Sequence, residues 1–316
     1  MKKLIILLIL PLYVMGYDFL GNAQTQSFMK EMQNKHGFSK HYLESIFSKA
    51  KLKSKILKRY QGAKKKYKTD ATWIKYSKNI VTPYMFKRAK KFKKQNYRLL
   101  SKIANHYDVP INLIVAFTGV ESSFGHYFGK YMIFDALSTL AFFDNRKTAF
   151  FRHELEEYLL FCREKGVSVL KVKGSFAGAM GWVQQLPSIN RKYGVDFNRD
   201  GVSDPWNKAD ALATIANFLH QNGWKNNRIV AIPASYSKKK FNAIYSHWDV
   251  QYSLRKLKNL GLNFGEFDQD KATLIVLFGK KSDEIWLGSK NFDVLTHYNN
   301  SVNYAMALYK ISTSFK

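Results

Sequence analysis

Apolar residues recur at helical spacing through the middle of the chain, from about residue 101 to 224. Three segments repeat with a period near 3.6 residues: DALSTLAFF, RHELEEYLLFCREKG and NKADALATIANFLHQNGW. A fourth apolar stripe, INLIVAF, follows Asp108, a candidate N-cap, and Pro110, which suits a first helical turn. This pattern predicts a chain of helices.

The spacing changes between about residues 226 and 291. Three runs there are rich in β-branched and aromatic residues and alternate more nearly with period two: RIVAIPAS, ATLIVLFG and the shorter DEIWLGS. The last stretch, THYNNSVNYAMALYKIS, returns to a helical pattern. The fold class expected is therefore α+β, mainly α, with a small β-rich insert.

The N-terminal part is basic. Between Lys51 and Arg98 there are 18 lysines and arginines and one acid, Asp70, interleaved with aromatic and aliphatic residues that are too numerous for a disordered tail. We expect helices that bury an aromatic face and expose lysines, either as an ordinary solvated surface or as a binding face. Cys162 is the only cysteine, which excludes an intramolecular disulfide and indicates a buried core thiol.

The formal charge of +28 predicts attraction to polyanions such as nucleic acid, anionic lipid or an anionic wall polymer. The first residues, MKKLIILLILPLYVMG, resemble a secretory signal peptide cleaved after about Gly16. A retained anchor is the alternative, although the apolar run is short for a span of about 20 residues. No cysteine follows it to carry a lipid. Export disfavours a nucleic-acid partner and favours a wall polymer.

Glu121, in TGVESSFG, follows an apolar run at the expected end of a helix. The negative end of the helix dipole and apolar neighbours both favour a protonated carboxyl, which suits a general acid. An ordinary surface glutamate fits the same local pattern.

Two later stretches carry further candidate chemistry. KGSFAGAMGWVQQLPS has small residues that permit close backbone approach, while Trp182, Gln184 and Gln185 can contact a sugar; tight helix packing explains the small residues equally well. DFNRDGVSDPWNKAD begins like a calcium loop but has Asn207 where an EF-hand has glutamate. An Asx-rich turn without calcium is the alternative.

In this order, the three stretches resemble those of the lytic murein transglycosylase B family, which has a lysozyme-like catalytic core. GVESSFG is similar to the family's V-E-[ST]-x-[FWY]-G motif, and KGSFAGAMGWVQQLPS to its K-G-S-[FW]-A-G-A-M-G-x-x-Q-F-[ML]-P-S stretch. The calcium-loop segment and YNNSVNYAMALY also follow the family pattern. The resemblance covers about residues 105–224 and 291–309. Gln185 and Leu186 depart from the usual Phe and Met, which predicts altered cleft packing.

The resemblance implies roles for individual residues. Glu121 becomes the catalytic acid and base, and Ser175 and Gln184 contact the sugar. Arg146 matches the first member of an arginine pair, whereas Lys147 replaces the second and loses bidentate geometry. Tyr298, Asn299 and Tyr304 match cleft residues. The implied calcium ligands are Asp196, Asn198, Asp200, Val202 through its backbone oxygen, and Asp210 as the closing carboxylate.

The implied activity is cleavage of the β-1,4 bond between N-acetylmuramic acid and N-acetylglucosamine in peptidoglycan, with a 1,6-anhydro product and no cofactor beyond a structural calcium ion. A hydrolytic muramidase and a non-catalytic wall-binding protein are the alternatives. Peptidoglycan strands and other cell-wall enzymes are the candidate partners, in a periplasmic or otherwise exported setting. The expected organisation is a signal peptide (1–16), a basic helical region (17–104), the core (105–225), the insert (226–290) and a C-terminal segment that completes the core (291–316).

Overall fold

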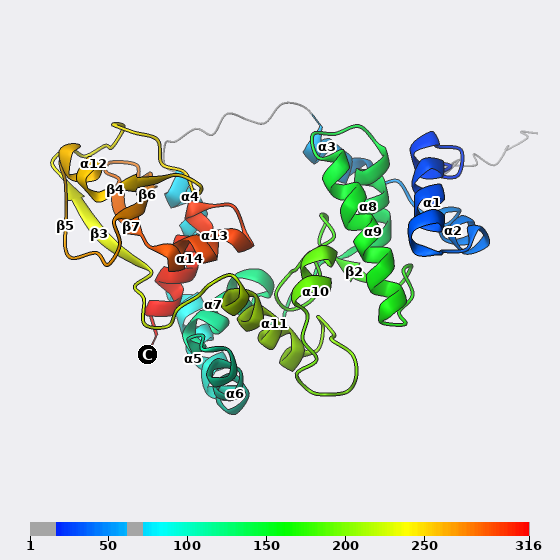
Figure 1. Ribbon diagram of the computed structural model, residues 1–316, viewed down its shortest axis with the longest axis horizontal. Coiled ribbons are helices and arrows are strands. Elements are labelled where there is room, and N and C mark those ends of the chain that lie inside the picture. Colours follow the sequence, from blue (N-terminus) through cyan, green and yellow to red (C-terminus); the bar gives the residue numbers. More distant parts are fainter. Residues whose placement is uncertain (1–16, 62–71, 316) are drawn as a thin grey trace, which may run out of the picture.

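The structure is a computed structural model that describes residues 17–61 and 72–315. The predicted signal peptide, 1–16, lies outside the described residues. Helices form most of the molecule, with a five-stranded sheet at one end and a two-stranded pair near the middle (Figure 1). This confirms the predicted mainly helical α+β fold. None of the helices in the two described ranges is long and apolar enough to cross a membrane.

One group of helices packs around a core of phenylalanines. Its members are α1 (Ala23–His36), α2 (Lys40–Phe47), α3 (Ser54–Tyr60), α8 (Ile133–Phe142) and α9 (Thr148–Glu164). The Phe47 ring lies 6.1 Å from Phe28 and 5.0 Å from Phe134, so aromatic contacts join α1, α2 and α8. The buried carboxylate of Asp135 accepts from the Lys51 amide at 2.9 Å and pairs with the Lys53 ammonium at 3.0 Å. These contacts fix the segment before α3 against α8.

A second group of helices surrounds α7, in which every residue from 113 to 119 is buried. The group comprises α4 (Thr72–Ser77), α5 (Pro83–Gln95), α6 (Tyr97–Tyr107), α7 (Ile111–Ser122), α10 (Pro187–Tyr193), α11 (Lys208–Gln221), α13 (Lys290–Tyr298) and α14 (Val302–Thr313). Gly119 allows close contact with α5, because a Cβ there would lie 3.0 Å from the Met85 sulfur. The predicted C-terminal segment thus joins the same core as α7.

The described parts of the basic N-terminal region, 17–61 and 72–104, are mainly helical, but they are divided between the two groups, and residues 62–71 of this region lie outside the described residues. Helices α1 to α3 pack with α8 and α9, whereas α4 to α6 pack with α7, α11 and α14. Trp73 and Phe92 are buried in the second group, so part of the expected aromatic face contributes to the core.

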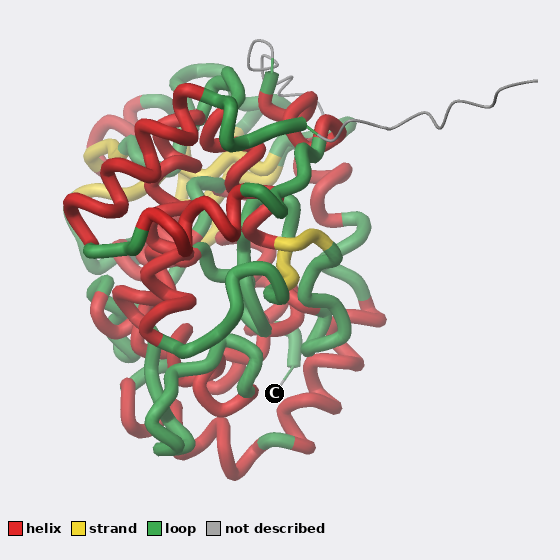
Figure 2. Tube along the Cα trace, turned by 90° about the vertical axis from the view of Figure 1, so that its right-hand side faces the viewer, coloured by secondary structure: helices red, strands yellow, loops and turns green. Residues whose placement is uncertain are grey.

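The insert is an antiparallel sheet in the order β4-β6-β7-β3-β5. Its elements are β3 (Ala231–Tyr236), β4 (Gln251–Ser253), α12 (Leu254–Asn259), β5 (Leu262–Phe264), β6 (Lys271–Leu277) and β7 (Glu284–Gly288). Strand β6 is buried on both faces: Ile275 and Leu277 pack on the helical core, whereas Leu274 and Val276 join the insert's own cluster. Seen from the side of α1 and α2, this sheet lies behind helices and apart from the short pair β1 (Tyr131–Met132) and β2 (Lys173–Gly174) (Figure 2).

Local details correct one prediction and confirm another. The prediction that Asp108 is the N-cap of α7 is wrong: Asp108 is the C-cap of α6, in the left-handed conformation with φ 51°, and Pro110 precedes α7 without a side-chain cap. Aspartate tolerates this conformation, so its presence before an apolar run did not identify which helix it ends. Cys162 is a free, buried thiol as expected, and burial raises its pKa to about 12.

Candidate active site

Glu121 lies in the last turn of α7, where the chain reverses sharply. Ser123 and Phe124, which follow it, have φ of 52° and 59°, the left-handed region that non-glycine residues rarely adopt. Arg88 of α5 stabilises this turn, since its guanidinium donates to the Ser123 hydroxyl at 2.6 Å and to the Ser123 carbonyl at 2.7 Å. The direction of the Glu121 side chain therefore depends on α5 as well as on α7.

The Glu121 carboxyl is enclosed by aromatic residues from the end of the chain. Tyr304, at the start of α14, donates its hydroxyl proton to Glu121 Oε1. Burial raises the pKa of Glu121 to about 7, and the hydrogen bond from Tyr304 opposes part of that rise. The predicted environment of a desolvated acid at a helix end is present.

Stacked rings hold Tyr304 in position. The ring of Tyr298 lies parallel to that of Tyr304, with centroids 6.3 Å apart, and Phe117 of α7 packs edge-on against Tyr298 at 5.0 Å. The Tyr298 hydroxyl donates to the Val183 carbonyl. Burial, and next the nearby Glu121 carboxylate, raise the pKa of Tyr298, so it remains a neutral donor. Asn299, the next residue, is exposed and its side chain makes no hydrogen bond to another described residue.

The stretch around Ser175 forms a tight turn after β2. The Ser175 hydroxyl oxygen accepts from the amides of Ala177 at 3.2 Å and Ala179 at 3.0 Å. Its proton has no acceptor among the described residues and is available to a ligand. Gly174 is required here, because a Cβ would lie 2.3 Å from the Ala179 carbonyl oxygen. The small residues of this stretch were expected to permit close approach of another backbone. At Gly174 the backbone that approaches is that of Ala179, in the same turn.

Gln184 adopts a left-handed conformation, with φ 48°. Its amide nitrogen donates to the carbonyls of Gly181 at 2.9 Å and Phe128 at 3.3 Å, which fixes the orientation of the side chain. The amide oxygen has no donor among the described residues. Ser175 and Gln184 therefore present one free donor and one free acceptor.

Trp182, in the glycine-rich stretch, contacts both the turn after Glu121 and the segment that contains Trp206. Its ring packs on Gly125, at which a Cβ would lie 2.3 Å from the indole. The indole nitrogen donates at 2.9 Å to the carbonyl of Trp206, which lies within the acidic loop, residues 196–210. One side chain thereby couples the turn after Glu121, the glycine-rich stretch and the acidic loop.

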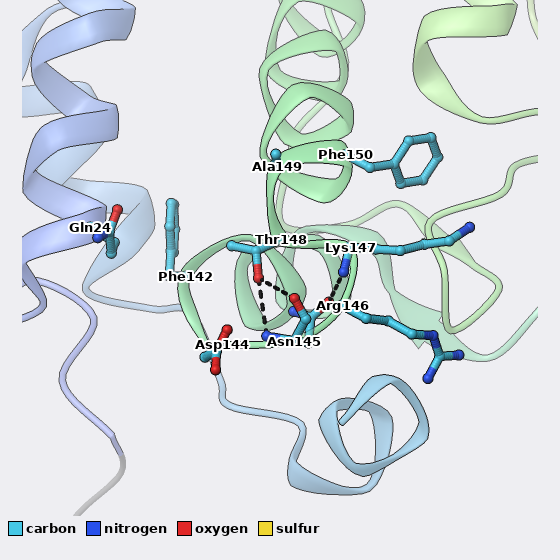
Figure 3. A pocket seen from close by; sticks show the side chains of 9 residues that line it. All are labelled: Gln24, Phe142, Asp144, Asn145, Arg146, Lys147, Thr148, Ala149 and Phe150. Carbon is cyan, nitrogen blue, oxygen red and sulfur yellow. Dashed lines mark hydrogen bonds between the residues drawn. The ribbon is translucent and has the colours of Figure 1, made fainter. Parts of the chain in front are cut away.

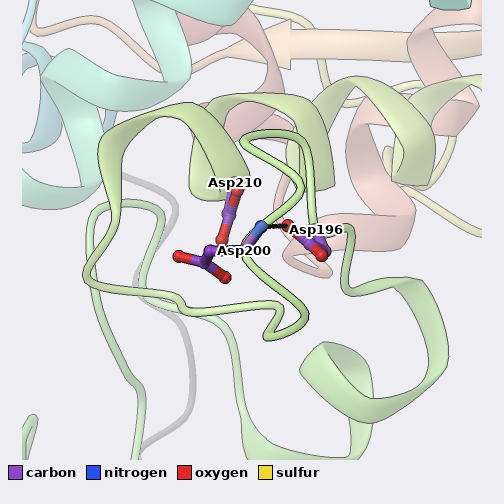
Figure 4. Close-up of side chains that lie close together, drawn as sticks. All are labelled: Asp196, Asp200 and Asp210. Atoms are coloured by element: carbon purple, nitrogen blue, oxygen red, sulfur yellow. Dashed lines mark hydrogen bonds between the residues drawn. The ribbon is translucent and has the colours of Figure 1, made fainter.

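The acidic loop brings three carboxylates together, shown in Figure 4: an oxygen of Asp196, one of Asp200 and one of Asp210 lie within 4.8 Å of one another. Asp210 is buried, and its two oxygens accept from the amides of Phe197 at 2.9 Å and Asp204 at 3.0 Å. Like charges this close repel unless a cation lies between them, and oxygen donors of this kind fit Ca²⁺.

The remaining loop residues have separate roles in this structure. Asn198 donates its side-chain amide to Asp200 at 2.7 Å, with its own carbonyl oxygen accepting from the Asp200 amide at 3.0 Å. Val202 is exposed and follows Gly201, which has φ 92°. Asn207 caps α11 by accepting from the Ala209 amide at 2.8 Å. The asparagine at the position of the EF-hand glutamate thus begins a helix, while Asp210, three residues later, points into the loop.

Arg146 and Lys147 lie on the turn between α8 and α9, beside a cavity of about 710 Å³, and their side chains extend to the same side (Figure 3). Arg146 donates to the Arg59 carbonyl at 3.2 Å and packs over the Tyr60 ring at 5.1 Å. Tyr60 in turn lies 6.3 Å from Phe176, the neighbour of Ser175. Among the described residues neither basic side chain contacts Glu121; Arg146 is connected to the Ser175 turn through Tyr60 and Phe176, and Lys147 packs over the Phe150 ring at 5.2 Å.

Residues 21–313 match the family model described as the transglycosylase SLT domain. The chain belongs to this family. It is 34% identical over 307 residues to the membrane-bound lytic murein transglycosylase B of Escherichia coli strain K12, covering 94% of this chain and 84% of that protein.

Solved structures of the family agree with the fold. An Escherichia coli lytic transglycosylase in complex with bulgecin A superposes with a TM-score of 0.87 at 34% identity, with 95% of each chain covered. The same enzyme in complex with calcium gives 0.85, again at 34% identity and 95% coverage of each chain. A soluble lytic transglycosylase from Pseudomonas aeruginosa gives 0.83 at 34% identity, with 92% of this chain and 97% of that chain covered. The predicted family and lysozyme-like core are confirmed.

Two residues of this transglycosylase site were not singled out from the sequence. Burial, and next the Glu121 carboxylate, raise the pKa of Tyr76, which places its hydroxyl in the electrostatic environment of the acid. Arg88 supports the turn after Glu121. Both belong to the basic N-terminal region, where many tyrosines, lysines and arginines share the same local pattern, and no local signal distinguishes these two.

Proposed function

We propose that this transglycosylase cleaves the β-1,4 bond between N-acetylmuramic acid and N-acetylglucosamine in peptidoglycan and releases a 1,6-anhydromuramic product, with Glu121 as the one catalytic carboxyl. The observation that carries this proposal is the environment of Glu121. A carboxyl with a pKa of about 7 is protonated in a large fraction of molecules near neutral pH, as proton donation to a leaving oxygen requires.

The same carboxyl serves both steps. Protonated Glu121 gives its proton to the glycosidic oxygen as the bond from that oxygen to C1 of the muramic acid breaks. The carbonyl oxygen of the substrate's own N-acetyl group bonds to C1 and stabilises the developing positive charge. The Glu121 carboxylate then takes the proton of the C6 hydroxyl, whose oxygen displaces the N-acetyl oxygen at C1. Glu121 ends protonated and no water is consumed.

A hydrolytic muramidase is disfavoured by the absence of a second acid. Hydrolysing glycosidases ordinarily use two carboxyl groups that flank the bond. Among the described residues, the side chain that hydrogen-bonds to Glu121 is Tyr304, and no second Asp or Glu shares a hydrogen bond with it. A non-catalytic wall-binding protein would have no need of a buried acid held by Tyr304.

The other site residues are proposed to bind and orient the strand. The free Ser175 hydroxyl proton and the free Gln184 amide oxygen suit the carbonyl and N–H of an N-acetyl group. Asn299 offers an unused amide, the half-buried Tyr298 presents aromatic surface, and the buried Tyr304 acts through its hydrogen bond to Glu121. Arg146 and Lys147, next to the Ser175 turn, suit the carboxylates of a stem peptide.

A structural calcium ion is proposed for the acidic loop, held by Asp196, Asn198, Asp200, the Val202 carbonyl and Asp210. The convergence of three carboxylates supports it, as does the calcium complex of the Escherichia coli relative. The ion would neutralise these charges and stiffen the loop against Trp206, and hence against Trp182. It takes no part in bond cleavage.

The charge of +28 and the predicted signal peptide support an exported protein that acts on the cell wall. Lysines of the basic region would raise the local concentration of an anionic polymer. We further propose other cell-wall enzymes as partners. The predicted export and the proposed peptidoglycan substrate support this. Binding to sacculi that does not weaken with added salt would contradict the electrostatic part of this proposal.

The test is product analysis with purified sacculi and a Glu121→Gln variant. Wild-type protein is expected to release muropeptides one water lighter than hydrolysed ones, and Glu121→Gln to release none. Glu266→Gln, at an exposed glutamate of the insert that makes no ion pair with a described residue, is the matched control and keeps full activity. Hydrolysed products, or substantial activity of folded Glu121→Gln, would reject the proposal.

A further inference from the structure

A second cavity lies between the β-rich insert and the turn that joins α13 to α14, and its volume is about 560 Å³. One wall is the loop that precedes β4, with Phe241, Tyr245 and Trp248; the other is the turn at 300–303. In Figure 1 this turn connects α13 to α14, close to the sheet. The site described above uses none of these residues.

The turn that lines this cavity leads directly into a residue that contacts Glu121. Asn299 and Tyr304 flank the turn, and Ser301 supports Tyr304 by accepting from its backbone amide at 3.3 Å. Tyr304 in turn donates to Glu121. Tyr304 directly follows the last residue of this wall, and its side chain hydrogen-bonds to the catalytic acid Glu121.

The loop before β4 presents three rings in succession. The rings of Tyr245 and His247 are stacked, with centroids 5.2 Å apart and planes at 16°, while Trp248 lies 5.4 Å from His247. Tyr245 is 63% exposed, an unusual position for a large ring on an otherwise structured loop. Flat, exposed rings of this kind pack against the apolar faces of sugars.

The loop is held firmly despite its exposure. The Ser246 hydroxyl donates to the Leu274 carbonyl at 2.8 Å and accepts from the Val276 amide at 3.1 Å, which binds the loop to β6. The Tyr252 hydroxyl donates to the Tyr245 carbonyl at 2.8 Å. A fixed platform loses little conformational entropy when a ligand binds.

The polar groups of the cavity match a neutral, amide-bearing ligand. The side-chain amides of Asn242, Asn300 and Asn303 make no hydrogen bond to another described residue. Lys240 pairs with the buried side chain of Asp283 at 3.0 Å, and the His247 ring hydrogen-bonds to Asp249. Among the described residues that line the cavity, an anionic stem peptide would find no unpaired lysine or arginine, whereas the hydroxyl and N-acetyl groups of a glycan would find free amides.

We propose that the insert forms an accessory glycan site, in which Tyr245 and Trp248 stack against N-acetylated sugars of the strand beyond those bound around Glu121. This rests on the proposed function, since the ligand is a further stretch of the same polymer. It predicts that the insert makes long strands better substrates than short ones.

The experiment compares wild type with Tyr245→Ala/Trp248→Ala on two substrates: long glycan strands freed of peptides by an amidase, and a defined tetrasaccharide. The double variant is expected to raise KM for long strands by about tenfold with kcat unchanged, and to leave the tetrasaccharide kinetics unchanged. Tyr97→Ala, at a tyrosine that is 57% exposed on α6, is the control and behaves as wild type.

Equal losses on both substrates, or no loss on long strands, would overturn the accessory site while the cleavage chemistry stands. Long strands that retain their peptides serve as a third substrate, and an effect of the double variant confined to them would overturn the glycan site and assign the cavity to the stem peptide instead. Binding is tested separately in the Glu121→Gln background, with N-acetylglucosamine oligomers followed by calorimetry. Glu121→Gln/Tyr245→Ala/Trp248→Ala is expected to bind long oligomers more weakly than Glu121→Gln alone. This result does not depend on lytic activity of the wild type, so the accessory site and the proposed cleavage reaction can fail independently.

Discussion

Replacement of Glu121 by glutamine offers a test of its environment that is independent of catalysis. Burial raises the pKa of this carboxyl from 4.5 to about 7. Between those values the folded protein binds more protons at this position than the unfolded chain, so stability falls as pH rises through this window and is constant above about pH 7. Glutamine cannot ionise and therefore removes this dependence.

The magnitude follows from the shift of roughly 2.5 units. At about 1.36 kcal/mol per unit, wild type should lose up to about 3 kcal/mol of unfolding free energy between pH 4.5 and pH 8 at this residue. Glu121→Gln keeps the isosteric shape and an oxygen that accepts from Tyr304. The difference in stability, variant minus wild type, should thus be about 3 kcal/mol larger at pH 8 than at pH 4.5.

Urea unfolding followed by tryptophan fluorescence at the two pH values measures this difference. Glu266→Gln serves as the control for loss of an exposed carboxylate. If Glu121→Gln and wild type show the same dependence on pH, the carboxyl is not desolvated and the argument for a raised pKa fails.

Three further predictions concern the surroundings of the acid. Tyr304→Phe removes the hydrogen bond that lowers the Glu121 pKa, so the alkaline limb of the pH profile of kcat/KM should move up by about one unit; an unchanged limb contradicts this contact. Calcium at 100 times its Kd should add about 2.7 kcal/mol to the free energy of unfolding and several degrees to Tm. Asp200→Asn should abolish that increment. A Tm that responds to neither calcium nor chelator refutes the ion site. Gln185→Met should raise stability by about 1 kcal/mol, because both polar atoms of this buried amide lack a partner among the described residues, and a lowered Tm would show that they are satisfied.

The hydrophobic pattern predicted the helices and strands that are long enough for a regular run of apolar residues to show. Helices α8, α9 and α11 and strands β3, β6 and β7 all lie within the predicted runs or close to them. Strands β4 and β5 have three residues each, which is too short for a period to show, and α12 between them was missed with them. The pattern also did not predict that the basic region would be divided between two packing groups, because that division depends on tertiary contacts.

The sequence predicted only those parts of the candidate site that lie within recognisable motifs. The local sequence indicated an acid at a helix end, and the family resemblance implied the distant residues. Tyr304 contacts Glu121 from 183 positions away, and no local property of either residue specifies that pairing. The same is true of Arg88 and Tyr76, whose contributions arise from where α5 and α4 pack. The cavity under the insert likewise combines segments about 60 residues apart.

The central claim is that Glu121 acts alone and that the C6 hydroxyl, not water, closes the reaction. Digestion of sacculi in water labelled with oxygen-18, followed by mass spectrometry of the released muropeptides, tests it directly. Anhydromuramic ends that contain no heavy oxygen are expected. Products one labelled water heavier, with oxygen-18 at C1 of the muramic acid, would contradict it.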